Sequence, residues 1–149
     1  DELVFVSFFG NVYRLSDSGD AVSLTNTFSI TDGVDGDWAP GGVDVAAYNE
    51  ANGVLFVTMH SDAYNGSHKN AAEEVWAVDL SSGDVLSRTP VHELSSISVT
   101  EGDAPILFGL DEESTLTRYD VDVDAGFTLS PAASLEGVGD WTVYAIAGR

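Results

Sequence analysis

Three carboxylates lie close together in one glycine-rich stretch of the sequence, at Asp32, Asp35 and Asp37. Carboxylate oxygens gathered on a loop are the ligands that a hard cation such as Ca²⁺ prefers, so one interpretation is a cation site. Asp and Gly are also the residues that tight turns require, because the Asp side chain bonds nearby backbone and Gly accepts positive φ. We expect turns here, with a cation site as the alternative.

A second acidic run alternates Asp with Val from Asp120 to Asp124. Its start resembles an EF-hand loop, but the sixth position is Ala125 rather than Gly and the twelfth is Pro131 rather than Glu. In a strand, alternate side chains point to the same face. The pattern therefore predicts carboxylates on one solvent-exposed face of a strand, without a calcium ion.

The three histidines, His60, His68 and His92, show no helical i, i+4 pairing and no HExxH context. His60 and His68 lie in one polar stretch, where hydrogen bonding within a loop is the simpler expectation and a zinc site is the alternative. The sequence has no cysteine, no GxSxG serine motif and no glycine-rich phosphate loop after a strand. Residue chemistry alone predicts no catalytic centre in this chain.

Charge restricts the partners of this 149-residue chain. Its formal net charge is −20, and its single lysine is Lys69. Such a surface repels phosphate, so nucleic acid and anionic membranes are poor partners, whereas cations or basic proteins are favoured. No apolar run of about 18 residues predicts a membrane-spanning helix. The length predicts one domain.

The elements that must position these side chains are short strands. Near copies of one apolar run recur at intervals of about 50 residues, at 3–7, 54–58 and 106–110. A second set follows, at 12–15, 75–79 and 116–120, and each copy leads to a glycine turn. Looser outer strands are expected at 22–30, 85–90 and 127–132, and inner strands at 43–48 and 95–99.

Four short strands in each repeated unit predict an all-β fold, a β-propeller of about three four-stranded blades plus a closing strand at 141–146. The predicted division is an incomplete blade and connector (1–37), two blades (38–91 and 92–136) and a ring-closing segment (137–149). A β-sandwich is the alternative, but it does not explain why the units recur in order. Because position 1 is Asp1 and the only methionine is Met59, we expect a removed leader or a piece of a longer protein.

The segment 38–80 organises the chain, because it contains three predicted strands and a polar insertion at 60–72. A tight hairpin needs only about two to five loop residues, so the insertion is surplus to folding and a candidate for function. Partner contacts are expected there, at Trp38, Tyr64, His68 and Lys69, and a self-packed surface loop is the alternative. The strand aromatics Tyr48, Trp76, Tyr119 and Trp141 are expected in the core.

Several motifs, in this order and spacing, resemble the late blades of a known family. They are 38–42, Ala47 with Tyr48, 55–57, 66–69, 74–79, Gly83, 92–99 and 105–108, with a weaker match upstream at 3–20. The family is the heavy chain of the tryptophan tryptophylquinone-dependent amine dehydrogenases, which act on methylamine or aromatic amines. The resemblance identifies the chain as similar to the carboxy-terminal part of that heavy chain.

The resemblance implies a seven-bladed propeller that is a non-catalytic scaffold with no cofactor of its own. It implies a periplasmic heterotetramer of two heavy and two light chains, in which the light chain carries tryptophan tryptophylquinone and oxidises primary amines to aldehyde and ammonia. A copper protein or a cytochrome is then the electron acceptor. The alternatives are a stand-alone ligand- or protein-binding β-propeller and a metal-dependent propeller hydrolase, for which the inner strands offer mainly Asp44.

Overall fold

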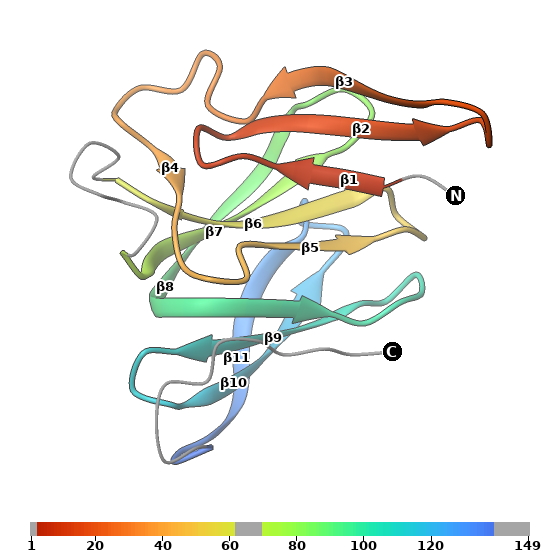
Figure 1. Ribbon diagram of the computed structural model, residues 1–149. Coiled ribbons are helices and arrows are strands. Elements are labelled where there is room, and N and C mark those ends of the chain that lie inside the picture. The colour runs from red at the N-terminus through yellow and green to blue at the C-terminus, as the bar shows by residue number, and fades with distance from the viewer. Residues whose placement is uncertain (1–2, 62–69, 139–149) are drawn as a thin grey trace.

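A computed structural model describes residues 3–61 and 70–138, and this part of the chain consists of β-strands, turns and loops (Figure 1). A three-stranded sheet contains β1 (Leu3–Val6), β2 (Asn11–Asp17) and β3 (Val22–Ser29). An eight-stranded sheet contains β4 (Ala39–Pro40), β5 (Ala46–Asn49), β6 (Val54–His60), β7 (Ala72–Asp79), β8 (Val85–Val99), β9 (Ile106–Asp111), β10 (Leu116–Asp122) and β11 (Thr128–Leu135). The prediction of an all-β, antiparallel chain is confirmed. None of the described residues form a helix long and apolar enough to cross a bilayer.

The repeated runs of the sequence form equivalent strands. The first set gives β1, β6 and β9, the second gives β2, β7 and β10, and each pair is joined in an antiparallel ladder. An outer strand follows each pair: β3, the first half of β8, and β11. We call β1–β3 the first unit, β4–β7 with residues 85–90 the second unit, and residues 94–99 with β9–β11 the third unit.

The second and third units share one strand, which the sequence did not predict. We expected separate strands at 85–90 and 95–99, whereas β8 runs through both ranges. Its first half pairs with β7 and its second half pairs with β9. Between the halves, Glu93 has a φ of 44°, in the left-handed region, and the ribbon turns sharply from one unit into the next (Figure 1).

The inner strand predicted at 43–48 is shorter and begins later in the structure, where β5 covers Ala46–Asn49. Val43 instead donates its backbone N–H to the Ser95 carbonyl at 2.7 Å, and Ile97 N–H donates to the Asp44 carbonyl at 3.2 Å. The start of the second unit therefore lies directly beside the start of the third. Gly42 makes this approach possible, because it has a φ of +111° and a Cβ there would stand 2.7 Å from the Ser95 carbonyl oxygen.

The second unit is buried on both faces. Alternate side chains of β6 and β7 point to opposite sides, so Phe56 and Val75 pack with the third unit while Val57 and Trp76 pack with the first. All four are at most 1% exposed. The apolar character of these strands on both faces is explained by this position between two neighbouring sheets.

The structure tests three of the four predicted core aromatics. Trp76 and Tyr119 are buried, as predicted. Tyr48 is 40% exposed, so its placement in the core was wrong. It stands near the end of β5, beside a turn in which Glu50 and Ala51 are also exposed. Trp141, with the predicted strand 141–146, lies outside the described residues.

Gly42→Ala is expected to destabilise the chain more than Gly19→Ala, and the pair separates steric overlap from backbone strain. Both glycines have positive φ, but a Cβ at Gly19 meets nothing within 4 Å. Gly19→Ala should cost about 1 kcal/mol for the left-handed conformation alone. Gly42→Ala should cost a further ~1–3 kcal/mol because it pushes the backbone away from Ser95. Urea unfolding of both variants measures the difference, and equal costs would contradict the close approach.

Candidate functional site

Several connections gather at one edge of the molecule, on the left in Figure 1. They are the β1–β2 turn, the connector from β3 to β4 and the β9–β10 turn, and β6 ends and β7 begins at the same edge. Of the predicted partner contacts, Trp38 lies on the β3–β4 connector at this edge. Tyr64, His68 and Lys69 lie outside the described residues, so their prediction as partner contacts stays untested.

Trp38 belongs to a stack of two indoles and a guanidinium. Its ring centroid is 5.3 Å from that of Trp76, and the ring planes meet at 51°. The guanidinium carbon of Arg88 lies 4.5 Å from the centroid of each ring, which is within cation–π distance. Trp38 is half-buried in this stack. It is therefore a rigidly packed side chain with part of its surface open.

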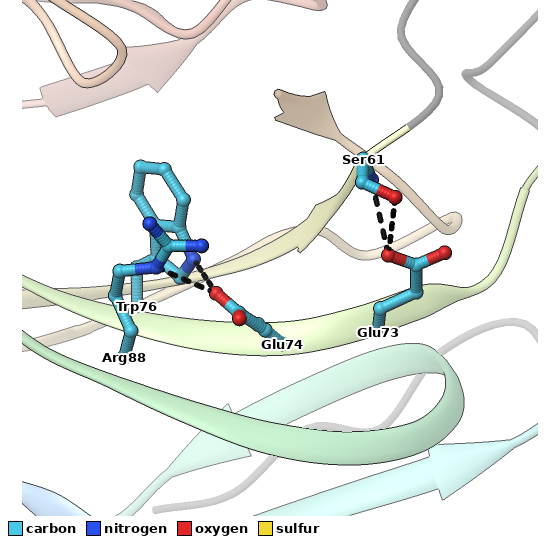
Figure 2. A network of polar contacts seen from close by, with 5 residues as sticks. All are labelled: Ser61, Glu73, Glu74, Trp76 and Arg88. Atoms are coloured by element: carbon cyan, nitrogen blue, oxygen red, sulfur yellow. Dashed lines mark hydrogen bonds and ion pairs between the residues drawn. The ribbon is translucent and has the colours of Figure 1, made fainter. Parts of the chain in front are cut away.

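Glu74 bonds to two members of the stack. Its Oε2 accepts a hydrogen bond from Trp76 Nε1 at 2.6 Å and an ion-paired hydrogen bond from Arg88 Nε at 2.7 Å (Figure 2). The strand register produces this arrangement, because Glu74 and Trp76 share one face of β7 and Arg88 is the β8 partner of Trp76. Sequence reasoning identified the tryptophans and missed Arg88 and Glu74. Glu-x-Trp spacing in a strand was the available signal.

The insertion begins and ends at a polar contact on the same edge. Ser61 donates to Glu73 Oε2 from its hydroxyl at 2.6 Å and from its backbone N–H at 3.3 Å (Figure 2). The predicted bounds of the insertion, 60–72, were too wide, because His60 completes β6 and Ala72 begins β7. These strands continue past the apolar run, where β4 provides another partner for β6.

His60 is a buried strand residue, which corrects its prediction as a loop residue. It is 1% exposed and pairs with Ala39 of β4. Its imidazole lies against Gly41, where any Cβ would overlap the ring. This packing explains why position 41 of the 38–42 motif is a glycine. The alternative of a zinc site with His68 cannot be assessed here, since His68 is outside the described residues.

The carboxylates considered as cation ligands occupy turns and solvent-exposed faces. Asp32, Asp35 and Asp37 are all exposed, and Asp32 N–H closes a turn onto the Ser29 carbonyl at 3.2 Å. Within residues 3–61 and 70–138, no group of three or more His, Asp or Glu side chains is placed to hold a metal ion. Asp44 bridges to the third unit through its backbone. The turn prediction is confirmed.

The Asp–Val alternation behaves as predicted within β10, which ends at Asp122, whereas Asp124 lies in the turn that follows. Asp120 and Asp122 are exposed, whereas Val121 packs against the core between the second and third units. Asp120 pairs with Arg118 at 2.8 Å, and Asp122 Oδ1 accepts the Ala125 N–H at 3.1 Å to close the turn. These carboxylates therefore serve surface and turn geometry.

A cavity of about 590 Å³ lies between the second and third units, and none of the described residues that line it is Asp, Glu, Lys or Arg. Its lining is mainly small or apolar: Thr89, Pro90, Val91, His92, Thr117, Tyr119, Leu129, Pro131, Ala132, Ala133 and Ser134. Burial, and then the negative charge of Asp111, raise the pKa of Tyr119 above its ordinary value. The Tyr119 hydroxyl therefore stays neutral at ordinary pH.

Asp79 is a perturbed carboxylate with a structural explanation. Its Oδ1 accepts the Ser81 hydroxyl at 2.6 Å and the backbone N–H groups of Ser81 and Ser82 at 2.7 and 3.0 Å. The Ser81 hydroxyl bond is the largest of the effects that lower the pKa of Asp79, and both backbone bonds add to it. The low pKa therefore reflects the β7–β8 turn, and it does not mark a reactive site.

Comparison with known proteins places these features in a wider context. Residues 1–138 match the family described as "Methylamine dehydrogenase heavy chain (MADH)". The chain is 32% identical over 125 residues to the methylamine dehydrogenase heavy chain of Methylophilus methylotrophus. The aligned region covers 80% of this chain and 30% of that protein. It is 28% identical over 115 residues to the corresponding protein of Methylobacillus flagellatus, with coverages of 75% and 28%. The chain thus spans under a third of the length of these relatives.

Arg88→Ala is expected to destabilise the chain by about 1–2 kcal/mol, because it removes the cation from two indole faces and leaves Glu74 with one donor fewer. Arg118→Ala is the matched control. Arg118 pairs with the exposed Asp120, so this substitution should cost about 0.5 kcal/mol or less. Chemical unfolding of both variants gives the comparison. Similar costs would show that the stack adds nothing beyond a surface ion pair.

The Asp79 carboxyl is expected to titrate below 3.8 when followed by NMR. Ser81→Ala should raise that midpoint, because it removes the strongest stabiliser of the charged form. In the parent protein, the lowered pKa of Asp79 stabilises the folded state at pH values above the unfolded pKa. This stabilisation is lost as the pH falls through the lowered folded pKa. Ser82→Ala is the control with a smaller expected shift, since the Ser82 hydroxyl bond is the weakest cause. A larger shift in Ser82→Ala would refute this account.

Proposed function

Because this chain belongs to the methylamine dehydrogenase heavy chain family, we propose that it acts as the heavy-chain scaffold of a periplasmic amine dehydrogenase. The observation that carries the proposal is the family match over residues 1–138, which includes every described residue. The task assigned to this chain is to hold a smaller, quinone-bearing light chain in place.

The proposed scaffold is a seven-bladed propeller of which this chain forms about three blades. The first unit supports this view, because its outward face is apolar and exposed: Leu3 is 59%, Phe5 47% and Leu24 58% exposed. These side chains alternate with Val4 and Val6, which pack against the second unit. An apolar sheet face of this kind is what a further blade would cover. The relatives are more than three times as long as the matched region, which leaves room for further blades.

Catalysis in this proposal belongs to the partner. Tryptophan tryptophylquinone in the light chain would supply the oxidation of a primary amine to aldehyde and ammonia. The described part of this chain contributes packed strands, hydrogen-bonded turns and a cavity lined mainly by small or apolar side chains. Its residues would bind and orient the light chain and keep water away from the shared boundary.

The edge that carries Trp38 is the proposed contact region for the light chain. Trp and Arg are the residue types that most often dominate binding at protein interfaces. Trp38 and Arg88 are already held in place by Trp76 and Glu74, so little side-chain freedom would be lost on binding. We assign Tyr64, His68 and Lys69 to the same contact region, because they belong to the insertion that starts and ends at this edge.

The remaining members of the proposed assembly are a second heavy chain and an electron acceptor, either a copper protein or a cytochrome. The net charge of −20 favours an acceptor that presents a basic surface.

Co-expression provides the direct test. The full-length heavy chain is produced with the small cysteine-rich chain encoded beside it, and the purified material is assayed for quinone absorbance and amine-dependent reduction of a dye. We expect co-purification and activity only when both chains are present. Amine oxidation by the heavy chain alone would contradict the scaffold role, and failure of the two chains to associate would contradict the assignment of the light chain.

A further inference from the structure

The β1–β2 turn presents an aromatic pair that sequence reasoning did not single out. Phe9 is 81% exposed, which is the highest value among the exposed large hydrophobic side chains of the described residues, and Phe8 is 59% exposed. Leaving large aromatic surface in water is unfavourable, and two adjacent aromatic side chains exposed to this extent are typical of an interface.

The turn holds its aromatic residues rigidly. Ser7 Oγ accepts the backbone N–H groups of Phe9 at 3.3 Å and Asn11 at 3.2 Å, and Gly10 N–H donates to the Ser7 carbonyl at 2.9 Å. Gly10 adopts a φ of +74°, which the tight reversal requires. Because the backbone is already ordered, docking through Phe9 would cost little conformational entropy.

The same turn is tied to the acidic β3–β4 connector. Ile30 N–H donates to the Gly10 carbonyl at 2.8 Å, and the connector continues with Asp32, Asp35 and Asp37, all exposed. An apolar centre with a charged rim is the usual anatomy of a protein–protein interface. Arg88 and Arg118 do not neutralise this rim, since they pair with Glu74 and Asp120 respectively.

We propose that Phe9, supported by Phe8, anchors the light chain by inserting into an apolar pocket that is flanked by basic side chains on the light chain. This inference rests on the proposed function and adds to it a second anchor, at the same edge as Trp38 (Figure 1). Charge complementarity distinguishes the two candidate partners. A second copy of this chain would bring acidic side chains against the acidic rim, whereas a light chain with basic side chains around its pocket would be attracted to that rim.

The test measures the affinity of purified light chain for full-length heavy chain by calorimetric titration. Phe9→Ser is expected to raise Kd at least tenfold, because it removes a central aromatic anchor. Tyr48→Ser is the matched control: Tyr48 is an exposed aromatic at the opposite edge, and its variant should bind within about twofold of the parent. Asp35→Asn combined with Asp37→Asn should lower the association rate and weaken its dependence on salt.

Each other result overturns the inference. An unchanged Kd for Phe9→Ser would show that Phe9 does not anchor the light chain, and it would leave the proposed function intact. An unchanged Kd with a lower melting temperature would show that Phe9 is covered by another part of the heavy chain. Loss of self-association alone would assign the turn to a contact between copies. If the parent heavy chain itself failed to bind the light chain, the proposed function would fail, and this inference with it.

Discussion

Burial of β6 and β7 on both faces is the constraint on which the rest of the described structure depends. Phe56 and Val57 are neighbours in the chain, yet one packs toward the third unit and the other toward the first. Each is fully buried, so each contributes about 1.5–3 kcal/mol of hydrophobic stabilisation. The second unit therefore has no free sheet face, and its functional surface is confined to strand ends, turns and the outer strand.

Much of the fold follows from local sequence. Runs such as 54–58, with Val, Leu and Phe between glycine turns, predicted strands that the structure confirms. The continuity of β8 was not predictable in the same way, because its two halves pair with different neighbours through the bend at Glu93. His60 was missed for a related reason: it is polar, and its burial depends on pairing with Ala39, a contact that no local pattern specifies.

The candidate site was only partly predictable. Trp38 was identified as a large aromatic residue in a motif, but its partner Arg88 is distant in the sequence. Strand register places Arg88 beside Trp76, and Trp38 packs against both. Phe9 was passed over because an apolar residue near a strand is normally assigned to the core. Only the three-dimensional structure shows that the tight turn after Ser7 leaves its ring in solvent.

The shared strand β8 determines which parts of this chain can move as separate bodies. β8 carries the chain from the second unit into the third, since its first half pairs with β7 and its second half with β9, so relative motion of these two units has to bend this strand near Glu93. The first unit forms a separate sheet, and the chain passes from it to the second through the connector 30–38 alone. Moving the first unit away from the second would expose the apolar core between them, which includes Val12 and Trp76.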